Sequence, residues 1–151
     1  MALAVQIFAG GRAKSAAETI LAQSYLERAR DAGRALGFAG FELLEVDERK
    51  ADSFAAVLQP TAIVVALDER GKSLSSHEFS QLLARWRDDG ETRLTFLIGG
   101  SDGLPSDIKK RARHMFAFGV QTWPHLLVRT MLAEQIYRAI TILSGHPYHR
   151  N

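Results

Sequence analysis

Thr61-Ala-Ile-Val-Val-Ala66 is a short run in which four of the six residues are β-branched and none is charged. Such a run predicts a strand buried on both faces, as in a parallel sheet that is covered by helices. Further strands are expected at Leu3-Ala-Val-Gln-Ile-Phe8, Phe41-Glu-Leu-Leu-Glu-Val46 and Leu94-Thr-Phe-Leu-Ile98, with a short extended segment at 116–122.

Amphipathic stretches lie between these strands. Helices are expected at about 15–35, weakly at 52–58, at 75–89, after Pro105, and over the long apolar pattern of 127–143. Ser75 and Glu78 have the spacing of a capping box, and Gly90 follows as a stop signal. The alternation predicts a three-layer α/β/α fold with a mostly parallel sheet, in a single domain spanning residues 1–151.

The composition excludes several classes of protein. The 151 residues include no cysteine, which excludes disulfide scaffolds and Cys-based zinc sites. No apolar run is long enough to span a bilayer and the N-terminus does not resemble a signal peptide, so we expect a cytoplasmic protein with no membrane partner. The net charge of +2 does not by itself indicate a polyanionic partner.

Two loops follow predicted buried strands and should meet at one edge of the sheet, where open parallel sheets bind their ligands. One is Gly99-Gly-Ser-Asp-Gly103 and the other is Leu67-Asp-Glu-Arg-Gly-Lys72. The glycine spacing matches neither a dinucleotide fingerprint nor a phosphate-binding P-loop. An ordinary turn and a charged surface loop remain the alternative interpretations.

Other candidate motifs point to less specific chemistry. Trp123 before Pro124 is either an exposed ring that stacks on a base or a core residue. His146 and His149 have no third ligand nearby, so we expect no metal site, and no G-x-S-x-G motif indicates a hydrolase. Basic residues cluster at three places and predict either a phosphate-contacting face or a solvated surface: Arg85 and Arg87; Lys109, Lys110, Arg111 and Arg113; Arg129, Arg138, His149 and Arg150.

Three stretches together resemble one known family. They are Leu67-Asp-x-x-Gly-Lys-x-Leu-Ser-Ser76, Phe96-Leu-Ile-Gly-Gly-Ser-Asp-Gly-Leu104, and the stretch from Trp123-Pro-His through Arg138 to His146-Pro-Tyr-His-Arg150. Their order and spacing are similar to those of the RlmH family, SPOUT-class methyltransferases that methylate N3 of a pseudouridine in 23S ribosomal RNA. The resemblance covers about the last ninety residues, whereas the first sixty match only in general layout.

The resemblance implies a SPOUT-type α/β knot, in which the C-terminal segment forms a deep trefoil knot, and a homodimer with its active site near the subunit interface. It also implies binding of S-adenosyl-L-methionine by loops that correspond here to Leu67, Gly99, Gly100, Phe118, Gly119, Val120, Gln121, Thr122 and Trp123. Residues 116–122 depart from the Leu-Ser-Leu-Ser-x-Met-Thr pattern typical of the family.

The implied reaction transfers the sulfonium methyl group to N3 of a pseudouridine on the ribosome. We expect His149 to accept the N3 proton, with Tyr148 and Arg150 positioning the base and a phosphate. Arg129, Arg138, Lys109, Lys110 and Arg113 are the candidate RNA contacts. Two alternatives stay open: a non-catalytic RNA-binding module with this fold, and a SPOUT methyltransferase that acts on another RNA.

Overall fold

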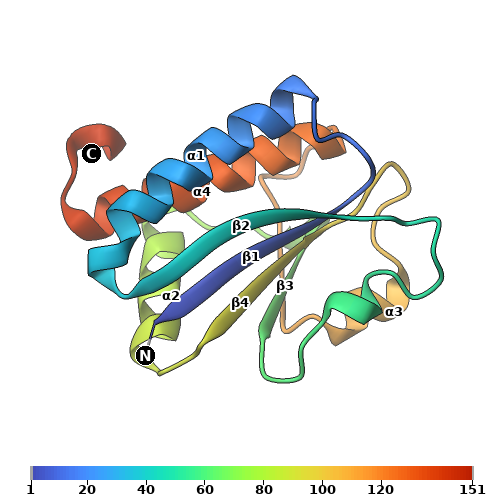
Figure 1. Ribbon diagram of the computed structural model, residues 1–151, viewed down its shortest axis with the longest axis horizontal. Coiled ribbons are helices and arrows are strands. Elements are labelled where there is room, and N and C mark those ends of the chain that lie inside the picture. Colours follow the sequence, from blue (N-terminus) through green and yellow to red (C-terminus); the bar gives the residue numbers. More distant parts are fainter. Residues whose placement is uncertain (1, 151) are drawn as a thin grey trace.

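The computed structural model describes residues 2–150 and contains one five-stranded sheet. The strand order is β2-β1-β4-β3-β5 and every neighbouring pair is parallel, so the predicted α/β class and parallel sheet are confirmed. Figure 1 shows the strands running together toward one edge. The strands are β1 (Leu3–Gly10), β2 (Phe38–Val46), β3 (Ile63–Lys72), β4 (Arg93–Ile98) and β5 (His114–Phe116).

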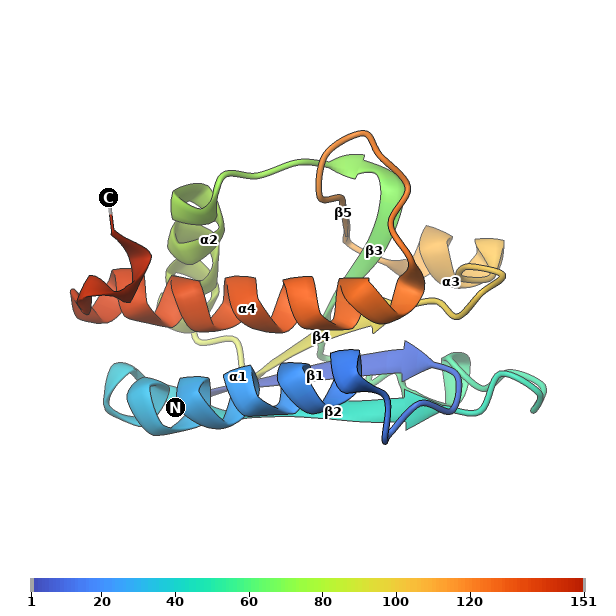
Figure 2. The same ribbon diagram turned by 90° about the horizontal axis from the view of Figure 1, so that it is seen from above.

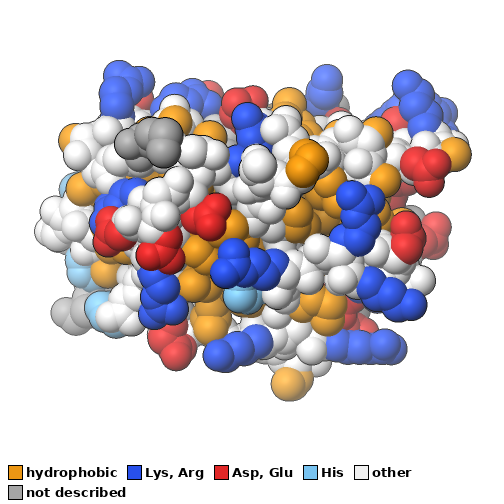
Figure 3. Space-filling view, turned by 90° about the horizontal axis from the view of Figure 1, so that it is seen from below, with side chains coloured by type: hydrophobic (Ala, Val, Ile, Leu, Met, Phe, Trp, Pro, Cys, Tyr) orange, Lys and Arg blue, Asp and Glu red, His pale blue; other side chains and the backbone are white. Residues whose placement is uncertain are grey.

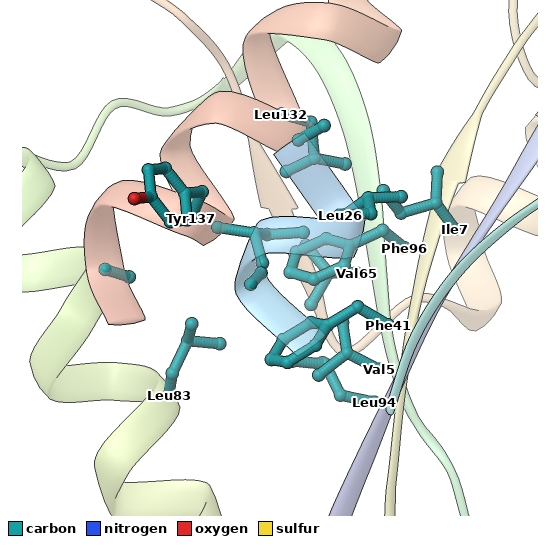
Figure 4. Close-up of a cluster of buried hydrophobic side chains, with 14 of the residues drawn as sticks. Val5, Ile7, Leu26, Phe41, Val65, Leu83, Leu94, Phe96, Leu132 and Tyr137 are labelled. Carbon is teal, nitrogen blue, oxygen red and sulfur yellow. The ribbon is translucent and has the colours of Figure 1, made fainter. Parts of the chain in front are cut away.

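Three long helices pack on the same face of the sheet. They are α1 (Ala17–Gly33), α2 (Ser76–Asp88) and α4 (His125–Ser144), and α1 lies alongside α4 (Figure 2). Alternate strand residues such as Val5, Phe96 and Val65 point toward them and meet Leu26, Leu83 and Leu132 in the main core (Figure 4). Burial of this apolar surface is the main stabilising contribution to the fold.

The opposite face of the sheet has a thinner cover. A second apolar cluster joins Val64, Ala66 and Leu97 of the strands to Phe54 and Ile108. Ile108 belongs to the short helix α3 (Ser106–Arg111), which supplies the third layer. Residues 63–66 and 94–98 are all buried, as the uninterrupted apolar runs predicted.

Three expected elements differ in the structure. The weak helix at 52–58 is a set of turns with one 3-10 turn at Ala55–Val57, because Asp52 has a positive φ of 55°, which no α-helix accommodates. The loop at 67–72 continues strand β3, with a register shift against β5. The extended segment at 116–122 leaves the sheet after Phe116, and the Ala117 amide donates to the Lys72 carbonyl.

Residues 117–124 lie against the link between β3 and α2. Besides the bond from Ala117 to Lys72, the amide of Gly119 donates to Ser73 Oγ at 3.1 Å. Figure 2 shows this segment arching beside the end of β3 before it enters α4. Such a crossing is consistent with the knot that the resemblance implies, and the knot itself stays a prediction.

Candidate functional site

A cavity of about 470 Å³ lies at the carboxyl edge of the sheet, where β3 and β4 end. Its walls come from the end of β3, the loop 99–104, the segment 116–123 and the first turns of α4. The two loops expected at one edge of the sheet therefore meet at a common cavity, at the place where parallel α/β sheets bind ligands.

Most residues expected to bind the cofactor line this cavity, and two do not. Gly119 and Val120 are absent from its wall, and the side chain of Val120 is 96% exposed. For these two, cofactor binding stays a prediction. The expected residues that line it are Leu67, Gly99, Gly100, Phe118, Gln121, Thr122 and Trp123.

The loop after β4 is tight because it has no room for a side chain at Gly99. A Cβ atom there would lie 2.3 Å from the carbonyl carbon of Gly103 and 2.5 Å from the Leu104 nitrogen. The next amide, that of Gly100, donates to Glu48 Oε2 at 3.2 Å. Two residues without side chains therefore line the cavity at this loop, and the amide of the second is already bound by Glu48.

Glu48 was not among the residues expected at this site. It lies in the loop after β2, fifty-two positions before Gly100, and its carboxylate occupies the space beside Gly10 and Gly100. No local motif links it to the glycine loop, so only the folded chain reveals the contact. Glu48 holds the loop from behind, because it accepts from the Gly100 amide and does not itself line the cavity.

The segment 118–123 forms a closed loop over one side of the cavity. The indole Nε1 of Trp123 donates to the carbonyl of Phe118 at 2.8 Å, and the Trp123 side chain is 38% exposed. Trp123 is thus neither a core residue nor a fully exposed ring. Its ring nitrogen closes the loop through the bond to Phe118, and the residue also lines the cavity.

The cavity carries negative charge although the whole chain has a net charge of +2. Its wall includes Asp68 and Glu69 but no lysine or arginine. Burial alone would raise the pKa of Asp68, but hydrogen bonds from the Arg70 amide and from Lys109 Nζ, 3.2 Å away, outweigh it and lower the pKa. Asp68 is therefore ionised at neutral pH. A wall of this sign suits a cationic ligand and disfavours a phosphate.

The C-terminal tail lies far from this cavity in the same chain. His146 caps a 3-10 turn at Pro147–His149 that follows α4, whereas the cavity lies at the opposite end of that helix. Twenty helical residues at 1.5 Å each separate the two by about 30 Å (Figure 2). The structure therefore does not bring His149, Tyr148 and Arg150 together with the cavity of their own chain.

Tyr148 is held by a cluster of aromatic and charged side chains. Its hydroxyl donates to Glu134 Oε2 at 2.7 Å, and its ring lies 4.7 Å, between centroids, from that of Tyr137. Burial and the bond to Glu134 raise the pKa of the Tyr148 hydroxyl. The guanidinium of Arg28 lies 5.5 Å from the same ring. The Tyr148 hydroxyl is thus engaged in anchoring the tail, while Nδ1 of His149 is buried with no partner among residues 2–150.

The prediction that Arg129 contacts RNA is wrong. Its side chain is fully buried and makes an ion pair with Glu45 at 2.8 Å, with further hydrogen bonds to Thr19 and the Gly10 carbonyl. A guanidinium without exposed surface cannot contact a phosphate. Its position three and seven residues before Leu132 and Ile136 places it on the buried face of α4, which was the available sequence signal.

The other basic candidates differ in accessibility. Arg138 pairs with Glu134, four residues earlier on the same helix, and Lys109 pairs with Asp68 at the edge of the cavity. Lys110 and Arg113 are exposed. Figure 3 shows Lys and Arg side chains spread over the surface seen from below, several of them at its right-hand side, where Figure 1 places α3.

Residues 2–150 contain no candidate for a metal site or for a membrane-spanning helix. No group of three His, Asp or Glu side chains there could hold a metal ion. Among the helices of that range, none combines the length and the apolar character that crossing a membrane requires.

The fold is a parallel α/β fold in which residues 117–124 cross the β3–α2 link beside a cavity. This is the fold of a SPOUT-class methyltransferase. The family model described as "Predicted SPOUT methyltransferase" matches residues 3–149. The chain belongs to this family.

Particular relatives in the family carry a more specific name. The chain is 50% identical to the ribosomal RNA large subunit methyltransferase H of Beijerinckia indica, over 97% of this chain and 98% of the relative. It is 51% identical to the protein of the same name from Methylocella silvestris, over 93% and 95%. These relatives match along nearly their whole length.

Solved structures share the fold at low sequence identity. A probable methyltransferase from Bordetella pertussis Tohama I superposes with a TM-score of 0.55 at 12% identity, over 92% of this chain and 95% of that one. A probable methylase family protein from Haemophilus influenzae Rd KW20 gives a TM-score of 0.53 at 8% identity, over 99% and 70%. They support the fold and carry no information about the substrate.

Proposed function

We propose that this protein transfers a methyl group from S-adenosylmethionine to N3 of a pseudouridine in the RNA of the large ribosomal subunit. The observation that carries the proposal is the cavity at the carboxyl edge of the sheet, whose wall includes a glycine loop and two carboxylates but no lysine or arginine. S-adenosylmethionine has a sulfonium cation and no phosphate, so this wall suits it better than it suits a dinucleotide.

The residues present fit this cofactor. Leu67, Gly99 and Gly100 line the cavity at the ends of β3 and β4, and Trp123 closes the loop that faces them. When bound, the cofactor supplies an electrophilic methyl group. The departure at 116–122 from the typical family pattern changes side chains, whereas main-chain contacts from this segment are compatible with many sequences.

The protein's own contribution is to orient the two reactants and to remove a proton. Holding the acceptor nitrogen in line with the donor carbon converts a bimolecular step into an effectively unimolecular one. N3 of a uracil-type base must lose its proton, and an imidazole near neutral pH is a suitable acceptor. We assign that role to His149, whose Nδ1 has no partner within residues 2–150. Arg150 is exposed and free to contact a phosphate.

The distance between the tail and the cavity supports a homodimer. His149 lies at the far end of α4 from the cavity of its own chain, so a second copy must supply the tail if this residue takes part in the reaction. Exposed apolar side chains at one end of α1 and α4 provide surface for such an association. They are Ile20, Leu21 and Leu127. We therefore propose a symmetric dimer with two composite sites.

The substrate and the cellular location follow from the relatives' names and the exposed basic residues. Proteins named ribosomal RNA large subunit methyltransferase H align over nearly all of this chain, which supports one methyltransferase domain over residues 1–151 and a cytoplasmic ribosomal substrate. Lys110 and Arg113 are exposed and remain candidate RNA contacts. Because N3 lies on the pairing edge of the base, the target nucleotide must be unpaired or flipped out.

The direct test is transfer of labelled methyl from S-adenosylmethionine to ribosomes from a strain that lacks this gene. Ribosomes with uridine in place of pseudouridine, and tRNA, serve as controls. Label only on the pseudouridine-containing ribosomes is the expected result. Label on tRNA would favour a SPOUT enzyme for another RNA, and ribosome binding without any transfer would favour a non-catalytic module.

A further inference from the structure

The two carboxylates of the cavity wall differ in their electrostatic surroundings. Asp68 is paired with Lys109, whose ammonium lies 3.2 Å from Asp68 Oδ2. Glu69 forms no ion pair within residues 2–150. Because no lysine or arginine lines the cavity, the charge of Glu69 is uncompensated at its edge.

A contact across the cavity keeps Glu69 in place. The hydroxyl of Thr122 donates to Glu69 Oε2, although the two residues are fifty-three positions apart. Glu69 belongs to β3, whereas Thr122 belongs to the loop closed by Trp123. One carboxylate oxygen therefore ties the two walls together, and the other has no hydrogen-bond partner in the described chain.

The ligand carries a charge of the opposite sign. S-adenosylmethionine has a sulfonium and an ammonium, whereas S-adenosylhomocysteine retains only the ammonium and 5′-methylthioadenosine has neither. A cation held near an uncompensated carboxylate gains binding free energy that a neutral analogue does not gain. The strength of this effect depends on ionic strength, since Glu69 is exposed.

We propose that Glu69 is the counter-charge for a cationic group of the bound cofactor and thereby selects the charged methyl donor. This inference rests on the proposed binding of S-adenosylmethionine and adds a residue that determines ligand selectivity. The role needs the charge and not only the shape of the side chain, because a neutral amide can still accept from the Thr122 hydroxyl.

The experiment compares the wild-type protein with Glu69→Gln by isothermal titration calorimetry, using all three ligands at low salt. Glu69→Gln should weaken binding of S-adenosylmethionine by about tenfold, the order expected for one solvent-screened charge pair. The loss should shrink at high salt. Glu27→Gln, which removes an exposed carboxylate on α1 away from the cavity, is the matched control and should bind all three ligands as the wild type does.

The three ligands identify which cation is involved. A loss confined to S-adenosylmethionine assigns Glu69 to the sulfonium, and an equal loss for S-adenosylmethionine and S-adenosylhomocysteine assigns it to the ammonium. Losses of affinity that do not follow the charge of the ligand overturn the inference. Such outcomes include an equal loss for all three ligands and no loss for any of them. If the wild-type protein binds none of the ligands, the proposed function itself fails, and Glu69 is not the cause.

Discussion

Arg129 places a charge where four elements of the fold meet. It extends from α4 to Glu45 of β2, Thr19 of α1 and the last carbonyl of β1, and its side chain has no exposed surface. Glu45 also accepts from the amide of Ala13, so the same pair holds the link between β1 and α1. A buried pair of this kind is costly to break, because the remaining partner keeps its charge in a poorly solvated place.

We therefore expect Arg129→Met to lower the free energy of unfolding by about 3–5 kcal/mol, as removal of one partner from a buried ion pair does. Urea denaturation followed by circular dichroism measures the change. Arg113→Ala, at an exposed position, should change the value by no more than about 0.5 kcal/mol. Equal effects of the two substitutions would contradict the structural role of Arg129.

His114 makes stability depend on pH at the edge strand β5. Its ring lies 5.4 Å from that of Trp86, and its Nε2 atom is buried with no partner among residues 2–150. Burial and the nearby charges of Arg113 and Lys72 lower its pKa below the ordinary value of 6.5. The fold thus favours the neutral ring.

Below pH 6.5 the unfolded chain binds a proton at His114 more readily than the folded chain does, so stability should fall as the pH decreases toward the lowered value. His114→Phe keeps an aromatic ring beside Trp86 and should reduce this loss between pH 7 and pH 5. Thermal unfolding across that range provides the measurement. His77→Gln, at an exposed position of α2, should leave the slope unchanged; an unchanged slope in His114→Phe would disprove the assignment.

At the scale of elements, the loop after β4 has the strictest steric requirement at the cavity. A Cβ on Gly99 would meet the backbone of Gly103 and Leu104, which cannot move without opening the loop. At Gly40, by contrast, a Cβ would meet nothing within 4 Å. The two glycines therefore provide a matched pair of substitutions.

Gly99→Ala should lower the affinity for S-adenosylmethionine by about tenfold or more, because a displacement near 1 Å is costly in a preorganised site. Gly40→Ala should leave the affinity unchanged. Quenching of tryptophan fluorescence is a suitable measurement, since Trp123 lines the cavity. Normal binding by Gly99→Ala would show that this loop does not shape the cofactor site.

The local sequence predicted those helices and strands in which a single residue pattern dominated. Four of the six residues at 61–66 are β-branched, and a strand forms there from Ile63 onward. The Ser75–Glu78 capping box also forms as its spacing predicts, with Glu78 N donating to Ser75 Oγ at 3.0 Å. The loop residues of the cavity followed from the position of strand ends. Three features did not follow from the local sequence, because each depends on segments far apart in the chain: the contact of Glu48 with Gly100, the ion pair of Arg129 with Glu45, and the distance from His149 to the cavity.

At the scale of the whole molecule, the proposed dimer makes a prediction about mixed subunits. One variant, His149→Ala, keeps an intact cavity, and the other, Gly99→Ala, keeps an intact tail. If each tail serves the cavity of the other copy, a mixed dimer contains one complete site.

Co-refolding the two inactive variants in equal amounts should therefore restore about a quarter of the wild-type methyl transfer per subunit, the value for random pairing into symmetric dimers. At a cofactor concentration too low to occupy the weakened site of Gly99→Ala, each variant alone should remain inactive. Transfer of labelled methyl to ribosomes gives the readout. No recovery from a mixture shown to contain mixed dimers would place His149 at its own chain's site or outside the reaction.

The sheet order also sets when the protein can fold during its synthesis. Strand β1 pairs on one side with β4, so Ala4 lies opposite Arg93, and both strands share one core with α4, the last long helix in the chain. Pairings between distant segments slow folding, and the unfinished core is exposed to aggregation until they form. A nascent chain that ends before α4 cannot cover its central strands, so folding must be completed only after nearly the whole chain has been released.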